Sequence, residues 1–295
     1  MRKLLLAFMA VCGLLPAQTL DGVVDIHAHC DPDSMARSID AIDLAKLARD
    51  RGMRALVLKN HYESTESMAY LVRKVVPGIE LFGGIALNRT VGGINPAAVE
   101  HMTRVKGGWG RVVWMPTFDA ENQVRYSKES RPFVAVSNGG TLLPEVREVI
   151  ALVAKNNLTL ATGHSSAEED LMLVREARRA GVERILVTHG MLPPVGMSIE
   201  QMREAGRLGA YIEFVYNALI GATKMFDLPE YARAIRAVGP EHCILSSDLG
   251  QAGNPLHPDG FVAFFAALRS QGFSVAEIEC MAKTNPAKLL GMTAR

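Results

Sequence analysis

Short apolar runs alternate with longer amphipathic segments along nearly the whole chain. The apolar runs are rich in Val, Ile and Leu, and runs of only four to eight such residues favour buried β-strands. We predict strands over Val23–His27, Ala55–Lys59, Leu81–Leu87, Val112–Met115, Leu158–Thr162, Ile185–Thr188, Ala210–Val215 and Ile244–Ser247. The segments between them carry apolar residues at helical spacing and charges on the other face. We predict helices that include Asp43–Arg51, Ala97–Arg104, Leu143–Asn156, Ser166–Ala180, Ile199–Leu208 and Leu228–Val238.

The order of these elements predicts an α/β fold, a (β/α)8 barrel (TIM barrel). Apolar strands joined by helices imply a parallel sheet that is covered on both faces. Eight strand–helix units fit a closed barrel of roughly 250 residues better than an open doubly wound sheet. No glycine-rich phosphate turn follows the first strand, which weakens that alternative further. We expect a single domain over residues 18–295, with a long loop at 117–142 that is either a lid or a surface insertion.

The first 17 residues have the pattern of a secretory signal peptide. The basic start Met1–Lys3 is followed by the apolar run Leu4–Leu15 and then by Pro16, Ala17 and Gln18. The run is too short for an ordinary transmembrane helix, which needs about 20 residues. The alternative is a buried N-terminal helix. We therefore expect cleavage near Ala17 and a periplasmic or secreted protein that does not remain in a membrane.

The composition is that of a folded globular protein. Hydrophobic residues make up 48% of the chain, and 32 Lys and Arg residues are balanced by 31 Asp and Glu residues. This composition excludes an intrinsically disordered chain. A net charge of +1 also argues against nucleic acid as the main partner, since a phosphate-binding face usually leaves a basic excess. We expect a small-molecule substrate, and homo-oligomerisation stays open.

Residue types that bind metals gather where the predicted strands end. In a barrel these ends meet on one face around one axis. Side chains two apart on a strand point the same way, so His27 and His29 can hold one ion between them. A His-x-His pair alone is weak evidence, but its conjunction with other strand-end ligands indicates a metal site. The strand-end residues are His27 and His29 on the first strand, Lys59 and His61 on the second, His164 on the fifth, His189 on the sixth and Asp248 on the eighth.

This arrangement resembles the amidohydrolase superfamily of metal-dependent hydrolases. The topology match covers nearly all of the chain after the signal peptide. The segments Lys59–Tyr62 and Asn88–Gly93 look most like an uncharacterised subgroup, so the resemblance indicates a reaction class and not a substrate. The resemblance rests on Asp25-Ile26-His27-Ala28-His29, His164, His189, Asp248 and the closing segment Thr284–Gly291.

The resemblance implies a role for each strand-end ligand. His27 and His29 would bind the more buried metal. His164 and His189 would bind a second metal, or one of them would complete a single site. Asp248 would contact the metal and act as general base on the attacking water, whose pKa a bound metal lowers to around 7. We expect zinc, as one or two ions, with manganese or iron as alternatives.

One expected ligand of the binuclear members is missing. They carry a bridging carboxylated Lys or a Glu at the end of strand 4, whereas here that strand ends in Val113–Thr117. Lys59, at the end of strand 2, is the nearest substitute. It either forms a carbamate and bridges two metals, or stays cationic and holds a substrate carboxylate or a nearby Asp. Without a bridge, a single-metal site of His27, His29, His164 and Asp248 is the alternative.

Four residues are candidates for substrate contacts. Arg89 can bind an anionic group through its planar guanidinium, and a surface salt bridge is the alternative. His257 is either a substrate contact or a structural contact, and His61 is either a substrate contact or a further ligand. The four candidates are His61, Asn88, Arg89 and His257.

Two acidic residues lie close to the strand-end group. Asp25 faces the same side of the first strand as His27 and either supports the histidines as a hydrogen-bond acceptor or is simply a buried carboxylate. Glu213, near the end of the seventh strand, either reaches the site or caps a neighbouring Arg.

These features predict an exported hydrolase that uses one or two divalent metals to activate water. Its target would be an amide, a lactone or a related ester bond, and a phosphoester would suit the same chemistry. One alternative is an exported barrel that binds a metal or a ligand without catalysis. Another is a metal-dependent decarboxylase or isomerase on the same scaffold, because a fold does not fix a function.

Overall fold

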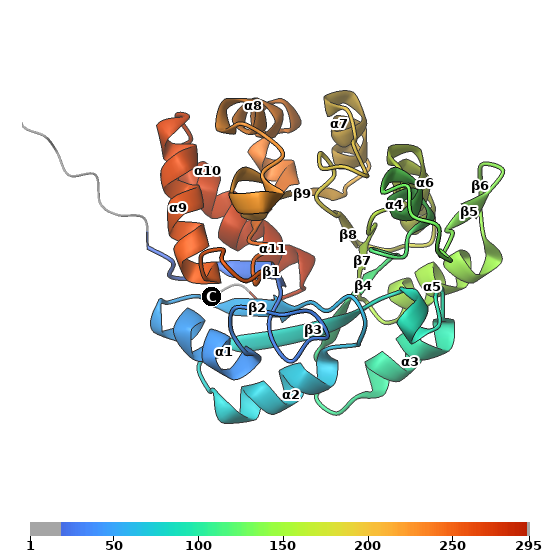
Figure 1. The fold of residues 1–295 in the computed structure, drawn as a ribbon, viewed down its shortest axis with the longest axis horizontal. Helices are drawn as coiled ribbons and strands as arrows, with labels where there is room; N and C mark the ends of the chain where they lie inside the picture. Colours follow the sequence, from blue (N-terminus) through green and yellow to red (C-terminus); the bar gives the residue numbers. More distant parts are fainter. Residues whose placement is uncertain (1–18, 294–295) are drawn as a thin grey trace, which may run out of the picture.

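The computed structural model describes residues 19–293, so the expected signal peptide lies outside the described residues. The chain forms a barrel of eight parallel strands surrounded by helices (Figure 1). Each strand overlaps one of the predicted strands, and the prediction of a (β/α)8 barrel is confirmed. In order around the barrel the strands are β1 (Val24–Ala28), β2 (Ala55–Leu58), β3 (Glu80–Ala86), β4 (Gly110–Trp114), β7 (Thr159–Ala161), β8 (Arg184–Val187), β9 (Tyr211–Val215) and β10 (Cys243–Ser246).

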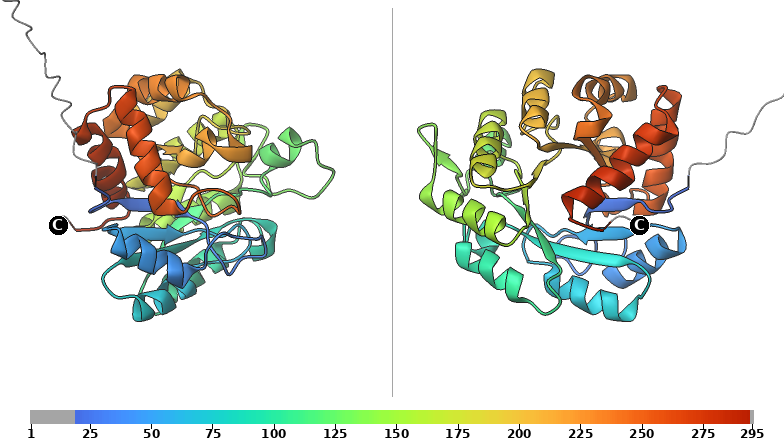
Figure 2. Two further views of the ribbon diagram at one scale, coloured as in Figure 1. Left: turned by 60° about the vertical axis from the view of Figure 1, so that its left-hand side comes forward. Right: turned by 180° about the vertical axis from the view of Figure 1, so that it is seen from behind.

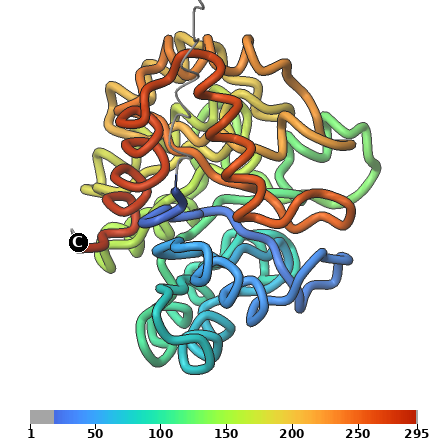
Figure 3. The backbone as a smooth tube through the Cα atoms, turned by 90° about the vertical axis from the view of Figure 1, so that its left-hand side faces the viewer, coloured from blue at the N-terminus to red at the C-terminus, as the bar shows by residue number. Residues whose placement is uncertain are grey.

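The last strand returns beside the first and nearly closes the barrel. The backbone N–H of Asp248 donates to the carbonyl of His27, and the N–H of His29 donates to the carbonyl of Leu249, both at 3.0 Å. Figure 3 shows the dark-blue start of the described chain running against the red and orange C-terminal segments. These bonds lie at the carboxyl ends of β1 and β10. Closure of the barrel therefore brings His27 and His29, from β1, next to Asp248, which follows β10.

Helices cover the outside of the barrel (Figure 2). Two of them begin with a capping box, in which a serine and a residue three positions later satisfy each other's backbone N–H groups: Ser166 with Glu169, and Ser198 with Gln201. Within residues 19–293 no helix is long and apolar enough to cross a membrane. The outer helices are α1 (Ala41–Asp50), α2 (Glu66–Val75), α3 (Pro96–Arg104), α5 (Pro144–Lys155), α6 (Ala167–Arg179), α7 (Ile199–Arg207), α8 (Leu228–Val238) and α9 (His257–Ser270).

The barrel interior is apolar at its amino end. Short C-terminal helices, α10 (Val275–Glu279) and α11 (Asn285–Leu289), follow the outer ring, and α11 contacts β1, β8 and β10. Leu289 and Leu290 pack into the same buried cluster as the inward-facing strand residues. Because apolar side chains fill this end, the polar strand-end residues are left at the carboxyl end, where TIM barrels carry their sites. The strand residues of the cluster include Val24, Ile26, Ala55, Val57, Phe82, Val112, Trp114, Leu186 and Ile244.

The segment expected as a long loop at 117–142 contains regular structure. It forms a short helix, α4 (Glu121–Tyr126), and a hairpin of β5 (Ser137–Asn138) and β6 (Thr141–Leu142). Buried Val124 and Val136 anchor it to the body of the protein. In the left view of Figure 2 this green segment projects beside the carboxyl face of the barrel. It is an ordered insertion and not a plain loop, and three of its residues, Thr117, Phe118 and Gln123, contact histidines of the site described below.

Candidate metal centre

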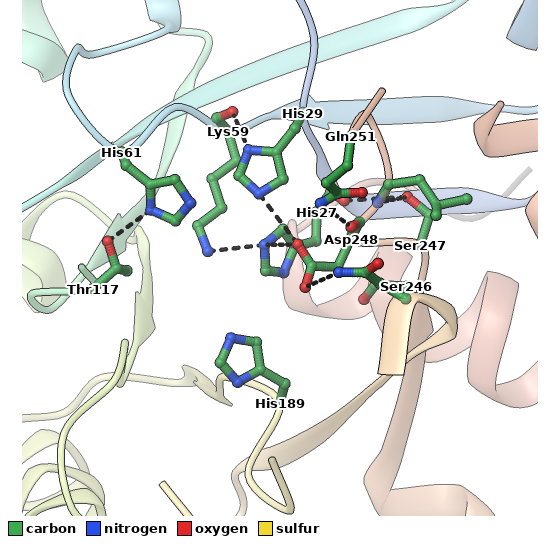
Figure 4. Close-up of polar contacts among 12 residues, drawn as sticks. His27, His29, Lys59, His61, Thr117, His189, Ser246, Ser247, Asp248 and Gln251 are labelled. Carbon is green, nitrogen blue, oxygen red and sulfur yellow. Dashed lines mark hydrogen bonds and ion pairs between the residues drawn. The ribbon is translucent and has the colours of Figure 1, made fainter. Parts of the chain in front are cut away.

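Three side chains meet where β1 and β10 end. The ligand atoms of His27, His29 and Asp248 all lie within 4.8 Å of one another. Asp248 Oδ1 is 3.0 Å from Nε2 of His27 and 3.2 Å from Nε2 of His29 (Figure 4). Both histidines are buried, and the Asp248 side chain is 13% exposed. Two imidazoles and a carboxylate in this arrangement are a candidate site for a divalent metal.

Hydrogen bonds orient both imidazole rings toward this point. Nδ1 of His27 lies 3.0 Å from Oε1 of Glu213, and Nδ1 of His29 lies 3.0 Å from the carbonyl oxygen of Lys59. Both oxygens are acceptors, and for His29 this contact is shorter than the 3.4 Å to Nη2 of Arg37, so each ring carries a proton on Nδ1 and turns Nε2 toward Asp248. Burial opposes a charge on His27, but Asp248 and Glu213 outweigh it and raise the pKa of His27 to about 9. A metal would therefore displace a proton from Nε2 of His27 on binding.

Glu213 extends from β9 into this group, so the sequence alternative of an Arg cap does not apply. Besides His27, its Oε1 accepts from the hydroxyl of Ser246 at 2.8 Å. Its Oε2 accepts from the backbone N–H of His189 at 3.0 Å. His189 and Asp248 both have positive φ, +28° and +49°, which is uncommon for residues with a side chain. Such local strain clusters at functional sites.

Asp25 supports the backbone below the histidines. Its Oδ1 accepts from the N–H groups of His27 and Ser247, both at 3.1 Å, and its Oδ2 accepts from the Ser247 hydroxyl. The carboxylate touches neither imidazole ring. Of the two alternatives left by the sequence, the structure shows a buried carboxylate that joins β1 to the end of β10.

A second pair of histidines, His164 and His189, lies beside the first pair. The rings of His164 and His189 are 4.9 Å apart, and the His189 ring is 6.0 Å from that of His27. Nδ1 of His164 donates to Oε1 of Gln123 at 2.8 Å, while Nδ1 of His189 is buried without a hydrogen-bond partner among residues 19–293. Burial lowers the pKa of His164 well below its usual range and that of His189 to about 4. Both rings are therefore neutral and able to ligate a metal, and the unpartnered nitrogen fits such a role.

Lys59 lies between the two groups of histidines. Its Nζ is 2.8 Å from Nε2 of His27 and 5.3 Å above the Trp114 ring, and its side chain is buried. No carboxylate of the described chain forms an ion pair with Lys59, but Asp248 and Glu213 lie close enough to raise its pKa against the effect of burial, so a nearby acidic partner stays a prediction. Burial lowers the pKa of Lys59 to about 8. A buried amine in this position calls for neutralisation or for an anion beside it.

His61 is packed between two rings at the edge of the cavity. Its ring stacks on Phe118, with centroids 3.8 Å apart, and on His29, with centroids 4.9 Å apart. Its Nδ1 lies 2.8 Å from the Thr117 hydroxyl. Burial lowers the pKa of His61 well below its usual range, so the ring is neutral.

Asn88 has no group free for a substrate. Its Nδ2 donates to the carbonyl of His61 at 2.7 Å and to the Thr117 hydroxyl at 2.6 Å. Its Oδ1 accepts from the N–H groups of Thr117 and Asp119. The engaged amide joins the loops that follow β2 and β4 and favours a structural role for Asn88 over a substrate contact, which stays a prediction.

Arg89 lies at the mouth of the site. Its guanidinium is exposed and forms no hydrogen bond, ion pair or ring contact within the described part of the chain, so the alternative of a surface salt bridge does not hold. It lines a cavity of about 550 Å³ together with Tyr62, Phe118, Gln123 and Arg131. Phe118 stacks on His61, and Gln123 holds His164, so this cavity adjoins the metal site.

His257 does not face this cavity. It is the first residue of α9 and is 0% exposed. Because no surface of its ring is accessible, the structure favours the structural alternative, and a substrate contact of His257 stays a prediction.

Sequence reasoning missed two residues that hold the site. Gln123 lies in the insertion, where no spacing or motif marks it, and Thr117 is an ordinary polar residue after β4. The only available signal was that the insertion follows a barrel strand, at the end where such segments carry function.

Comparisons with known proteins agree with this fold. The chain resembles a solved structure described as "Molecular Engineering of Organophosphate Hydrolysis Activity from a Weak Promiscuous Lactonase Template", with a TM-score of 0.63, 16% identity, and 93% of this chain and 100% of that chain covered. It also resembles the organophosphorus hydrolase from Deinococcus radiodurans, with a TM-score of 0.64, 15% identity, and 94% of each chain covered. A putative 2-pyrone-4,6-dicarboxylic acid hydrolase from Pseudomonas putida matches with a TM-score of 0.63, 17% identity, and coverage of 93% and 99%. No curated protein matches the chain.

These similarities confirm the resemblance to metal-dependent hydrolases at the level of the fold. Identity this low carries no substrate and no catalytic residue across. A family model described as "Family of unknown function (DUF6282)" matches residues 22–213, well over half of the chain. The expectation of an uncharacterised subgroup is confirmed, and the chain belongs to this family of unknown function.

Proposed function

We propose that this protein is an exported metal-dependent hydrolase. The observation that carries the proposal is the convergence of His27, His29 and Asp248, with ligand atoms within 4.8 Å of one another at the carboxyl face of a barrel. An adjoining cavity provides room for a substrate. The fold, shared with lactonases and organophosphate hydrolases, supports the same reaction class.

The residues present fit a divalent metal. His27, His29 and Asp248 would hold one ion, and His164 and His189 would hold a second ion or complete the first site. When bound, the metal lowers the pKa of a water ligand to around 7 and polarises the scissile carbonyl or phosphoryl group. Zinc suits imidazole and carboxylate ligands, and manganese and iron are the alternatives.

In this proposal, Asp248 is the general base that takes the proton from the attacking water. Its side chain is the most exposed of the three ligands, and its Oδ2 lies 3.5 Å from Nδ2 of Asn217. Burial would raise the pKa of Asp248, but His27 and His29 outweigh it and hold that pKa well below its usual range. The carboxylate is thus ionised and ready to accept a proton from water and to pass it to the leaving group.

Lys59 determines how many metals the site can hold. As a carbamate, formed by addition of its neutral amine to carbon dioxide with loss of a proton, it would supply the bridging anion that strand 4 lacks. As an ammonium ion, it would instead hold an anionic part of the substrate. Elemental analysis of protein purified with zinc and bicarbonate distinguishes the two: two equivalents support the bridge, and one supports the single-metal site.

The favoured substrate is a small molecule with a lactone, ester or amide bond, and phosphoesters suit the same chemistry. The unpaired guanidinium of Arg89 favours a substrate with an anionic substituent. We also propose that the chain is exported to the periplasm or beyond, in keeping with the signal-like residues 1–17, and that it acts on neither nucleic acid nor membrane.

Substitution of Asp248 by Asn tests the proposal. A hydrolase should lose nearly all turnover of a lactone such as dihydrocoumarin, with an unchanged circular dichroism spectrum. Asp227→Asn, at an exposed position, is the matched control and should keep wild-type activity. Unchanged ligand affinity with no turnover in the wild type would favour a binding barrel. If the reaction is run in ¹⁸O-labelled water and the product contains no ¹⁸O, a decarboxylase or an isomerase is favoured.

A further inference from the structure

A chain of hydrogen bonds runs from Asn88 through Thr117 to His61, and it fixes where the proton of His61 lies. The inference deepens the proposed function, since it concerns the same cavity. It begins with Asn88, whose amide can be oriented without ambiguity. Its Oδ1 faces two backbone N–H groups, those of Thr117 at 2.8 Å and Asp119 at 3.1 Å, and only an oxygen can accept from both.

The other end of that amide must therefore be a donor. It donates to the carbonyl of His61 at 2.7 Å and to the Thr117 hydroxyl at 2.6 Å. The Thr117 oxygen thus accepts one bond from Asn88. Thr117 is fully buried, and within residues 19–293 its hydroxyl proton has one further neighbour that can accept it, Nδ1 of His61 at 2.8 Å. A buried hydroxyl that satisfies its donor in this way leaves Nδ1 of His61 without a proton.

His61 then carries its proton on the other ring nitrogen from the one that is protonated in the other site histidines. In His27, His29 and His164, Nδ1 lies against an acceptor, so the neutral form of each ring keeps its proton on Nδ1 and offers Nε2 to a metal. In His61, Nδ1 accepts from the Thr117 hydroxyl, so the ring proton lies on Nε2 instead. This nitrogen has no hydrogen-bond partner within residues 19–293, and it is not among the polar atoms that the protein fully covers. Figure 4 shows it on the side of the ring where Lys59 lies, away from Thr117.

The ring is also held in place. It is stacked between His29 and Phe118, with interplanar angles of 24° and 16°. A fixed N–H group beside the metal ligands suits the stabilisation of charge that develops on a substrate oxygen, because a preorganised donor needs no rearrangement during the reaction.

We propose that His61 is a hydrogen-bond donor to the substrate through Nε2–H and is not a metal ligand. Thr117 and Asn88 act as positioning residues that select this tautomer. The proposed partner is the carbonyl oxygen of a lactone or ester, or the phosphoryl oxygen of a phosphoester, on the side of the cavity bounded by Phe118.

The tautomer can be observed directly. Two-bond proton–nitrogen correlation spectra of the metal-free protein with ¹⁵N-labelled histidine distinguish the two neutral forms, and the His61→Gln spectrum assigns the signals. We expect Nε2–H for His61 and Nδ1–H for His164 in the same spectrum. Thr117→Val, which removes the hydroxyl but keeps the shape, should abolish the Nε2–H preference, and Thr117→Ser should keep it. An Nδ1–H pattern for His61 in the wild type would overturn the proposal.

Metal content and kinetics test the role. His61→Gln should keep the wild-type zinc stoichiometry, and a loss of zinc would overturn the assignment as a non-ligand. With dihydrocoumarin or paraoxon as the probe, His61→Phe should lower kcat roughly 100-fold with little change in KM. His61→Gln should recover part of this loss, because its amide presents an N–H group. Equal kcat for His61→Phe and the wild type would contradict the proposal.

The two proposals fail in different ways. If the wild type binds zinc but hydrolyses neither probe, the hydrolase proposal fails for these bond classes, whereas the spectra and zinc content still decide the state of His61. If the wild type is active and His61 carries its proton on Nδ1, only the present inference fails.

Discussion

Glu213 connects three parts of the candidate site through one carboxylate. It accepts hydrogen bonds from the His27 ring, the Ser246 hydroxyl and the backbone of His189. Burial would raise the pKa of Glu213, but His27, with His189 and Lys59, outweighs it and lowers that pKa to about 2. The carboxylate is therefore ionised at neutral pH and increases the basicity of the His27 ring.

Glu213→Gln should weaken zinc binding by about 10- to 100-fold with little change in the fold, because an amide cannot accept at both of its ends. In the Glu213→Gln side chain, the amide NH₂ end would face one of the hydrogen-bond donors that now bond to the Glu213 carboxylate. Zinc affinity, measured by competition with a chromogenic chelator, checks this expectation. Ser246→Ala, which removes one bond to the same oxygen, should have a smaller effect. Wild-type zinc affinity in Glu213→Gln would show that the carboxylate is not needed to orient His27.

At the scale of elements, the insertion after β4 supports the second pair of histidines. In helix α4, Gln123 accepts from the His164 ring at 2.8 Å. The neighbouring Asn122 donates to the carbonyls of His164 at 3.1 Å and Pro194 at 2.9 Å. One short helix thus joins the loops that follow β7 and β8. The insertion positions His164 as well as bounding the cavity.

Gln123→Leu should lower kcat about 10-fold or more and weaken the metal site that includes His164, because the ring loses the acceptor that fixes its Nδ1 proton. Gln123→Glu keeps an acceptor and is the matched control. Zinc titration of both variants, followed with the kinetics of lactone hydrolysis, makes the comparison. If the two variants behave alike, the acceptor has no part in holding His164.

Helix α6 contains a buried carboxyl group that forms no ion pair within the described chain. Asp170 Oδ2 accepts from the Thr162 hydroxyl at 3.0 Å, and Oδ1 is buried without a partner in the described chain. Burial raises the pKa of Asp170 well above its usual range. The folded protein therefore holds this proton at pH values where the unfolded chain has lost it. This difference lowers the free energy of unfolding. The loss is absent below the unfolded pKa of about 4 and grows as the pH rises toward the folded pKa.

Asp170→Asn should therefore raise the melting temperature by a few degrees at pH 8 and have a smaller effect at pH 4, since the neutral amide has no proton to lose. Thermal unfolding followed by circular dichroism between these pH values checks the sign. Asp21→Asn, at an exposed position, is the control: its melting temperature relative to the wild type should not rise between pH 4 and pH 8. If the gain in melting temperature of Asp170→Asn instead shrinks as the pH rises, Asp170 is ionised in the folded state.

The sequence predicts some of these features and not others, for physical reasons. Strands such as β2 and β10 could be predicted because they are short and apolar, and His27 with His29 because strand ends of a barrel share one face. The type and position of Asn88 suit a substrate contact, whereas its partners lie in two loops that are 27 to 31 residues away along the chain. The contact between Gln123 and His164 spans 41 residues, and no local pattern encodes such a pairing.

For the whole molecule, the candidate metal site lies where the barrel closes. His27 and His29 come from β1, whereas Asp248 follows β10, and the two strands are the ends of the sheet. Hydrogen bonds between residues 27–29 and 248–249 already join them at this end. A metal held by all three side chains would add a link between the first and last strands. It would bind the closed barrel and not the unfolded chain.

Zinc should therefore stabilise the whole fold and not only the site. At a free zinc concentration 100-fold above Kd, the free energy of unfolding should rise by about 2.7 kcal/mol, which corresponds to a melting temperature a few degrees higher. Differential scanning calorimetry of chelator-treated protein, before and after addition of zinc, measures this shift. Asp248→Asn should reduce it strongly, because the link to β10 is weakened, whereas Asp227→Asn should leave it unchanged. A zinc-induced shift of wild-type size in Asp248→Asn would place the ion elsewhere and would separate metal binding from the closure of the barrel.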